Sequence, residues 1–167
     1  MTLSQRAQTQ VPARKKLSVG EVSKVSRPQL GPEMPVALFR VVRLIAMEDL
    51  LGRSAGSMLY NAGEKIGLTL DVKTPGDLVN LVEALKIGKV DVVEATATRI
   101  IVDVYECVTC SGMERVGHAI CHFEAGLVAG ALQKITGASV FVKETRCIGG
   151  LGDETCRMEA AIQPRAN

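Results

Sequence analysis

The sequence predicts an α+β domain in which helices pack on one face of a four-stranded antiparallel sheet. Three observations support this fold class. Apolar residues recur at helical spacing through residues 36–85, they alternate with polar ones near residues 90–106 and 139–162, and one further helical pattern separates the two alternating regions. The element order is therefore ααα-ββ-α-ββ. Because helices and strands are grouped in this order, we expect an antiparallel sheet.

Two helices are predicted in the first part of the domain. Pro35 suits the first turn of a helix and Gly52 can end it. Between them, apolar residues recur near helical spacing at Val36, Phe39, Val42, Ile45 and Met47. A second helix is expected from about Ser54 to Gly67. Its glycines lower the intrinsic helix propensity, so we expect another backbone to pack closely against it.

A third helix and a first hairpin follow. Thr74-Pro75-Gly76-Asp77 is a strong helix start, with a capping hydroxyl, a proline at the first helical position and an acidic residue near the positive end. Gly88 is expected to end this helix. Residues 90–94 and 99–106 then alternate as two antiparallel strands, with a polar bend between them.

The last three elements are a helix and a second hairpin. Residues 119–136 have helical periodicity, and Gly126 and Gly130 should let this helix lie close to whatever it covers. Ser139–Arg146 and Thr155–Ile162 are predicted as the two strands of the hairpin.

Length and charge limit the class of protein. The 167 residues suit one domain, of which residues 28–167 form the fold. Residues 1–27 are polar and basic, and they are predicted to be a flexible tail; the alternative is a short ordered arm around residues 17–25. A net charge of +2 argues against a nucleic-acid partner. No apolar run is long enough for a membrane span or a signal core, so we expect a cytoplasmic protein.

Three cysteines lie at the ends of the last elements. Cys121 falls in the first predicted turn of its helix, where the helix dipole favours a thiolate. Cys147 closes one strand of the hairpin and Cys156 opens the other. A bend near Arg146 would bring Glu144 to the same point. These four side chains could form a four-coordinate zinc site; the alternative is ordinary packing of buried cysteines.

A second pair of cysteines, Cys107-x-x-Cys110, follows the first hairpin. Such a pair binds metal, cycles between dithiol and disulfide, or has no special role. With Cys121 and His118 or His122 it could form a second thiol or metal site.

These residues resemble the 4-vinyl reductase domain family. The resemblance lies in the run Cys121-x-Phe123-x-x-Gly126-x-x-x-Gly130, in Val140-x-Val142-x-Glu144-x-x-Cys147 and in Gly152-Asp153-x-x-Cys156. Leu59-Tyr60-x-x-Gly63-x-x-x-Gly67 is similar to the second helix of that family. The resemblance extends over about residues 33–162. It implies a small-molecule or hydrocarbon-binding domain, related in fold to the TRAPP vesicle-tethering subunits, and a zinc ion held by Cys121, Glu144, Cys147 and Cys156.

The family name does not imply an activity here, because the sequence has no nicotinamide or flavin motif that could supply a hydride. The sequence therefore favours a non-catalytic domain that binds a hydrophobic small molecule and a structural zinc ion. The predicted pocket lies between helices and sheet, with walls from Phe39, Leu59, Tyr60, Leu81, Phe123 and Leu127. Two alternatives are a redox or tetrapyrrole-handling protein that uses Cys107 and Cys110, and a homodimeric assembly or regulatory subunit that pairs through helix 36–51.

Overall fold

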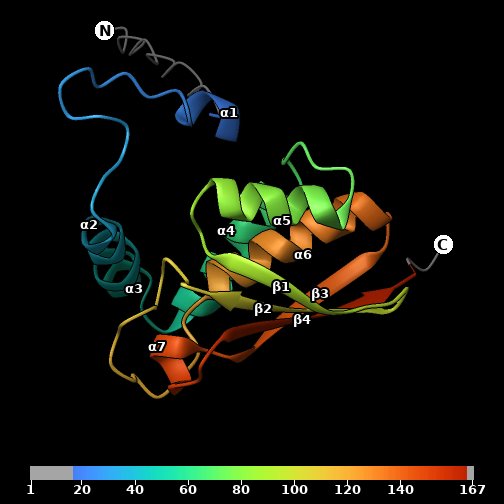
Figure 1. The fold of residues 1–167 in the computed structure, drawn as a ribbon. Coiled ribbons are helices and arrows are strands. Elements are labelled where there is room, and N and C mark those ends of the chain that lie inside the picture. The colour runs from blue at the N-terminus through green and yellow to red at the C-terminus, as the bar shows by residue number, and fades with distance from the viewer. Residues whose placement is uncertain (1–16, 165–167) are drawn as a thin grey trace, which may run out of the picture.

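The computed structural model describes residues 17–164, and its elements follow the predicted order (Figure 1). The sheet has the strand order β1-β2-β4-β3, and every paired neighbour is antiparallel. The strands are β1 Lys89–Ala95, β2 Arg99–Tyr105, β3 Ser139–Arg146 and β4 Cys156–Gln163. The predicted α+β class and its four-stranded antiparallel sheet are therefore confirmed.

The first predicted helix is continuous but contains a wider π-helical segment, Val41–Ala46, between α2 and α3. A short 3₁₀ segment, Gly52–Ser54, leads from α3 into α4. The α-helices are α1 Val19–Val22, α2 Val36–Arg40, α3 Met47–Leu51, α4 Ala55–Gly67, α5 Pro75–Ala84, α6 His122–Thr136 and α7 Ile148–Leu151.

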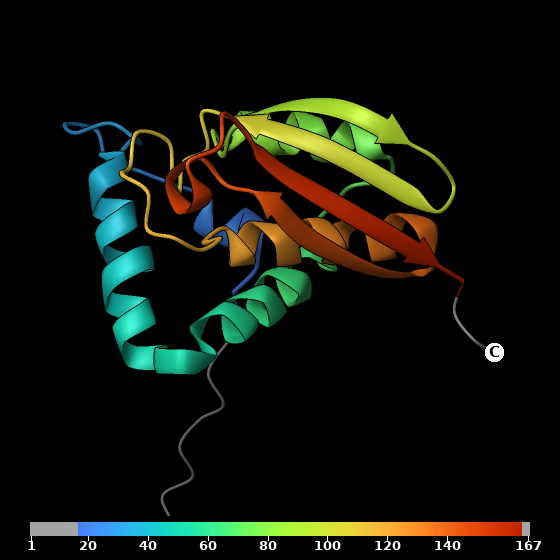
Figure 2. The ribbon, with the colours of Figure 1, turned by 90° about the horizontal axis from the view of Figure 1, so that it is seen from below.

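The helices α5 and α6 lie on one face of the sheet, and α4 lies beside α6 (Figures 1 and 2). The other face of the sheet carries no helix within the described chain (Figure 2). Burial alternates along β3 accordingly: Val140 and Val142 are buried under α6, whereas Phe141 between them is 63% exposed. The core therefore lies in the single layer between the sheet and these helices.

Helix α5 begins at the predicted capping residues but ends earlier than predicted. The Thr74 hydroxyl accepts a hydrogen bond from the backbone N–H of Asp77 at 3.1 Å, and the Asp77 carboxylate accepts one from the backbone N–H of Thr74 at 2.9 Å. The helix ends at Ala84 and not at Gly88. Gly88 instead lets the chain pass close to β2, because a Cβ there would overlap the Val104 side chain.

The predicted close packing of the glycine-rich helices is confirmed. A Cβ on Gly63 or Gly67 of α4 would overlap backbone carbonyl oxygens of α6, and a Cβ on Gly126 or Gly130 of α6 would overlap those of α4. The two helices therefore touch backbone to backbone, which fixes the position of α6 over the sheet.

The described part of the N-terminal segment contains one turn of helix, α1, which Ser18 and Glu21 cap reciprocally. The flexibility of residues 1–27 stays a prediction, and residues 1–16 lie outside the described range. Across residues 17–164, no helix has the length and apolar character that crossing a bilayer requires.

Candidate metal centre

All five cysteines of the chain meet in one buried region. Each is 2% exposed or less, and none forms a disulfide. They come from four places that are distant in sequence: the loop after β2, the residue before α6, the residue before α7 and the first position of β4. They are Cys107, Cys110, Cys121, Cys147 and Cys156.

Two local features direct the predicted ligands to one point. The helix expected from residue 119 begins at His122, so Cys121 is its N-cap and not part of its first turn. The backbone N–H of Cys121 donates to Glu144 Oε2 at 2.9 Å. The β3–β4 register is irregular between Glu144 and Arg146, which is the bend that the sequence required.

The first group of donors consists of the four predicted ligands. The donor atoms of Cys121, Glu144, Cys147 and Cys156 all lie within 4.8 Å of one another. Glu144 Oε1 is buried without a hydrogen-bond partner, so it has a free lone pair inside the group. Burial, and next the Cys147 thiol, raise the pKa of Glu144 to about 9. A divalent cation would remove that cost, and three sulfurs with one oxygen suit zinc.

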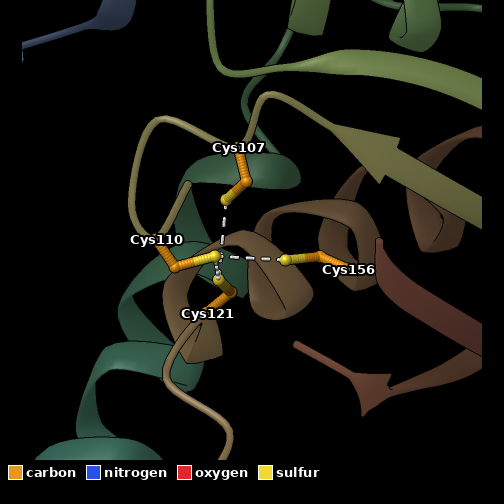
Figure 3. Close-up of side chains that lie close together, drawn as sticks. All are labelled: Cys107, Cys110, Cys121 and Cys156. Carbon is orange, nitrogen blue, oxygen red and sulfur yellow. Dashed lines mark hydrogen bonds between the residues drawn. The ribbon is translucent and has the colours of Figure 1, made fainter. Parts of the chain in front are cut away.

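The second group joins the CxxC pair to two of the same cysteines. Donor atoms of Cys107, Cys110, Cys121 and Cys156 also lie within 4.8 Å of one another (Figure 3). The Sγ atoms of Cys110 and Cys156 are 3.2 Å apart, those of Cys107 and Cys121 3.6 Å, and those of Cys110 and Cys121 3.7 Å. This buried cluster can therefore hold a metal ion.

The thiols of this cluster differ in how easily they ionise. Hydrogen bonding with Cys110, and then with Cys121 and Cys156, lowers the pKa of Cys107. Hydrogen bonding with Cys107, followed by Cys110, raises the pKa of Cys121. Ionisation of one thiol thus opposes ionisation of its neighbour, as expected where several acidic groups share one buried space.

Histidine is absent from both groups. His118, which the sequence offered as a partner of Cys107 and Cys110, is exposed, and Cys121 and Cys156 complete that set. The burial of the CxxC pair also weighs against thiol exchange with another protein, since reactive cysteines are at least partly exposed.

A cavity of ≈ 80 Å³ adjoins the cluster, between α5, α6 and the covered face of the sheet. Its wall exposes no polar surface, although Cys107, Cys156 and Glu124 are among the residues that line it. The apolar wall residues include Leu78 and Val82 of α5, Leu127 and Val128 of α6, and Ile100, Val102 and Val104 of β2.

Glu124 is a functional candidate that the sequence analysis missed. It is 8% exposed; its Oε1 accepts a hydrogen bond from the Thr109 hydroxyl at 2.7 Å, and its Oε2 has no hydrogen-bond partner. Oε2 lies 3.9 Å from the guanidinium of Arg43, which is itself buried. Burial raises the pKa of Glu124. The available signal was a carboxylate within the otherwise apolar helix sequence FEAGLVAGAL.

The cavity lies on the side of α6 that faces α5 and the sheet. Most of the residues predicted to form its wall lie elsewhere. Leu127 lines it, whereas Phe39, Leu59, Tyr60, Leu81 and Phe123 lie outside its wall. Leu59 and Tyr60 belong to α4, whose glycines leave no space against α6. The Tyr60 hydroxyl instead accepts a hydrogen bond from the backbone N–H of Val142 at 3.0 Å.

Comparisons of sequence agree with this architecture. The family model of the 4-vinyl reductase domain matches residues 100–162. The uncharacterized protein MJ1642 of Methanocaldococcus jannaschii is 30% identical over 134 residues, which are 80% of this chain and 81% of that protein. The uncharacterized protein MJ0150 of the same organism is 33% identical over 143 residues, 81% of this chain and 80% of that protein.

Solved structures that share the fold include the following three. A vinyl-4-reductase family protein from M. jannaschii has a TM-score of 0.63 at 20% identity, over 80% of this chain and 85% of that one. The phenol-responsive sensory domain of the transcription activator PoxR, solved with phenol, has a TM-score of 0.58 at 13% identity, over 77% of this chain and 75% of that one. A trafficking protein particle complex subunit 3 from Naegleria fowleri, covalently bound to palmitic acid, has a TM-score of 0.58 at 13% identity, over 79% of this chain and 97% of that one.

Proposed function

Because the chain belongs to the 4-vinyl reductase domain family, we propose that it is a non-catalytic domain that binds a small hydrophobic molecule and a structural zinc ion. The observation that carries the proposal is the apolar cavity beside α6, one end of which is formed by the cysteine cluster. Predominantly apolar walls are typical of ligand sites. Two proteins of the same fold were solved with an apolar or aromatic ligand, phenol in one and palmitic acid in the other.

The size of the cavity favours a compact ligand. An apolar cavity of about 150 Å³ in another protein takes up benzene. At ≈ 80 Å³, the space here is smaller still and would need small side-chain movements to admit a single ring. A long acyl chain would need far more room. We therefore propose a monocyclic aromatic or a short branched aliphatic molecule as the ligand class.

Glu124 is the proposed polar contact for that ligand, reached by a rotation of its side chain, because the wall of the empty cavity exposes no polar atom. Its carboxyl oxygens accept a hydrogen bond in either protonation state. Its unpartnered Oε2 belongs to a residue of the cavity wall. A ligand with one hydroxyl or carbonyl group would satisfy it, so phenol should bind more tightly than toluene.

Calorimetric titration with phenol, toluene and palmitate tests the ligand class. We expect saturable binding of phenol at one molecule per chain, weaker binding of toluene and none of palmitate. Glu124→Met should reduce the preference for phenol over toluene, because methionine has no side-chain oxygen that can pair with the phenol hydroxyl. The proposal is wrong if phenol neither binds nor shifts the NMR signals of the cavity-lining methyl groups.

The zinc ion is proposed on Cys121, Glu144, Cys147 and Cys156. These residues occupy all four positions of a tetrahedral ion, so the site is closed and structural in type. It would tie the mouth of the β3–β4 hairpin to the start of α6. Thiols that remain free in this cluster fit a reducing compartment such as the cytoplasm.

Metal analysis tests the zinc site. The purified protein should contain zinc, and Cys147→Ser should lose the ion held by Glu144 and lower the thermal unfolding midpoint. His118→Ala is the control: it alters an exposed potential ligand outside both groups and should change neither quantity. Metal-free protein with an unchanged midpoint in Cys147→Ser would refute this part of the proposal.

A second copy of the chain is the proposed partner of helix 36–51. Several large apolar side chains on it are exposed, among them Leu38 at 53%, Val42 at 52% and Ile45 at 64%. An apolar face of this kind marks an interaction surface, and a two-fold dimer would bury it against itself. Light scattering should give twice the monomer mass, and Ile45→Glu should give the monomer mass. A monomer at all concentrations would exclude the dimer.

A further inference from the structure

The two donor groups of the cluster share two cysteines, and a thiolate can bridge two metal ions. Each group has four donors within 4.8 Å of one another, and Cys121 and Cys156 belong to both. We propose that the cluster binds two divalent metal ions, bridged by the thiolates of Cys121 and Cys156. The first ion is the zinc of the proposed function, on which this inference rests. The second ion takes Cys107 and Cys110 as its remaining ligands.

The sulfur spacing fits thiolates around a single ion in the second group. A tetrahedral ion with zinc–sulfur bonds of about 2.3 Å places its sulfurs about 3.8 Å apart. Three sulfur pairs of this group lie at 3.2, 3.6 and 3.7 Å (Figure 3). A disulfide would require about 2.05 Å. A cubane iron–sulfur cluster, in which each thiolate binds a different iron, requires donors farther apart than these.

The net charge also favours two ions. Six ionised donors carry six negative charges, and two divalent ions neutralise four of them, which leaves two. One ion with four ionised donors also leaves two negative charges, but then two of the six donors must stay protonated and unligated. Two ions therefore use every donor of the cluster without adding to the charge that the buried site must stabilise.

Backbone groups are placed to stabilise the remaining charge. The N–H of Gly150 lies 3.3 Å from the Cys147 sulfur, and the N–H of Ile148 lies 3.4 Å from the Cys156 sulfur. N–H donors to metal-bound thiolates orient the ligands and spread their negative charge. Cys156, a proposed bridge, thus has a backbone donor of its own.

The CxxC turn is held in place by contacts that do not involve sulfur. Arg40 of α2 donates from Nε to the Val108 carbonyl and from Nη2 to the Ser111 carbonyl, both at 2.8 Å. Within the turn, the N–H groups of Cys110 and Ser111 donate to the carbonyl of Cys107. Both thiols are consequently directed inward, with exposures of 2% and 0%. A preformed, buried pair of this kind suits a structural ion.

The second ion would lie at the end of the ligand cavity. Cys107 and Cys156 are ligands in this group and also line the cavity wall. Loss of that ion would leave two thiols in place of a fixed metal–thiolate wall. The second ion therefore sets how firmly that end of the cavity is closed.

Native mass spectrometry of the whole chain, purified with zinc in the medium, tests the proposal. We expect two ions per chain in the unaltered protein. The double variant Cys107→Ser/Cys110→Ser should keep one ion, and Glu144→Gln/Cys147→Ser should also keep one. Circular dichroism on the same samples shows which variants are folded, and bound ions are counted only for those.

A second measurement needs no variant. In the cadmium-substituted protein, NMR should show two cadmium resonances coupled through the shared sulfurs. A single resonance, together with one ion per chain, overturns the second site.

The variants then separate the two proposals. Suppose that the unaltered protein binds a single ion. If Cys107→Ser/Cys110→Ser keeps that ion, the zinc site of the proposed function stands and the second, thiolate-bridged site is refuted. If it is lost there but survives Glu144→Gln/Cys147→Ser, both proposals fail, because the ion lies on the CxxC side alone. A chain without metal also overturns both.

Discussion

The two sides of α6 differ sharply in how they are packed. On the α4 side, glycines bring two backbones into direct contact, and no side chain separates them. On the side of α5 and β2, a cavity separates α6 from the apolar side chains that face it. The same helix is therefore fixed on one side and bordered by open space on the other. The proposed ligand would therefore enter beside a helix whose other side is held in place.

Sequence composition along α6 explains the difference. Gly126 and Gly130 are four residues apart and lie on one stripe of the helix. Leu127 and Val128 project from another side, toward the cavity. Small residues allow close helix contact, whereas branched residues from opposing elements leave gaps where their shapes do not interlock.

The largest effect is expected from a methyl group on the tight side. Gly126→Ala would place a Cβ against the carbonyl oxygen of Tyr60, so the two helices would have to separate. We expect unfolding free energy to fall by about 3 kcal/mol, the upper end for an overpacked core. Chemical denaturation measures this.

Gly76→Ala is the matched control for that substitution. A Cβ there would meet only the Thr74 hydroxyl oxygen, at an ordinary 3.7 Å, within helix α5. Alanine favours helix over glycine, so the variant should be neutral or up to about 1 kcal/mol more stable. Equal destabilisation by both substitutions would show that backbone contact does not distinguish the two sides.

An ion pair on the bare face of the sheet, which points away from the cavity, should be the next most sensitive feature. On the bare face of the sheet, Arg157 of β4 holds Asp103 of β2 through two hydrogen bonds of 2.7 Å. Asp103→Asn should cost about 2 kcal/mol, since it removes charge-assisted bonds from a largely buried pair. Denaturation at pH 7 measures the loss, and stability equal to that of the unaltered protein would contradict it.

The same pair predicts a pH dependence. Hydrogen bonding from Arg157 holds the pKa of Asp103 below its usual value of 3.8. A carboxylate whose pKa is lowered by folding stabilises the fold when ionised. Its contribution is full above pH 3.8 and is lost as the pH falls through the lower folded-state pKa. Below pH 4, Asp103→Asn should therefore lose less stability on acidification than the unaltered protein, as acid titration monitored by circular dichroism would show.

The smallest effect on stability is expected on the open side. Val128→Phe directs a larger side chain from α6 toward the cavity, so it should cost about 1 kcal/mol or less and abolish phenol binding. Val93→Phe makes the same change at a residue that is 52% exposed and outside the cavity wall. That control should keep phenol binding. Retained binding in Val128→Phe would place the ligand elsewhere.

The elements of the fold were predictable because their signals are local. The capping residues Thr74 and Asp77 identify a helix start from four neighbouring residues, and period-two alternation identifies each strand. The bend at Arg146 was also predictable, since Glu144 and Cys147 could not otherwise meet. These features depend on short stretches of chain.

The remaining features depend on contacts between distant segments. The CxxC pair meets Cys121 and Cys156 only because the loop at residues 106–121 folds back over the end of the sheet. Leu59 and Tyr60, which were predicted to line a pocket, do not line this cavity. The paired glycine spacings of α4 and α6 contained the signal: two such stripes pack on each other, which leaves the α5 side for the cavity.

The arrangement of the cluster has a consequence for the order of folding. Cys107 and Cys110 are brought together by one turn, and Cys147 and Cys156 by one hairpin, so each pair closes only a short loop. Short loops cost little chain entropy, and each pair could capture an ion before the domain is complete. Cys121 would then join the two halves when α6 docks. A metal ion bound there would thus link two early segments of the chain.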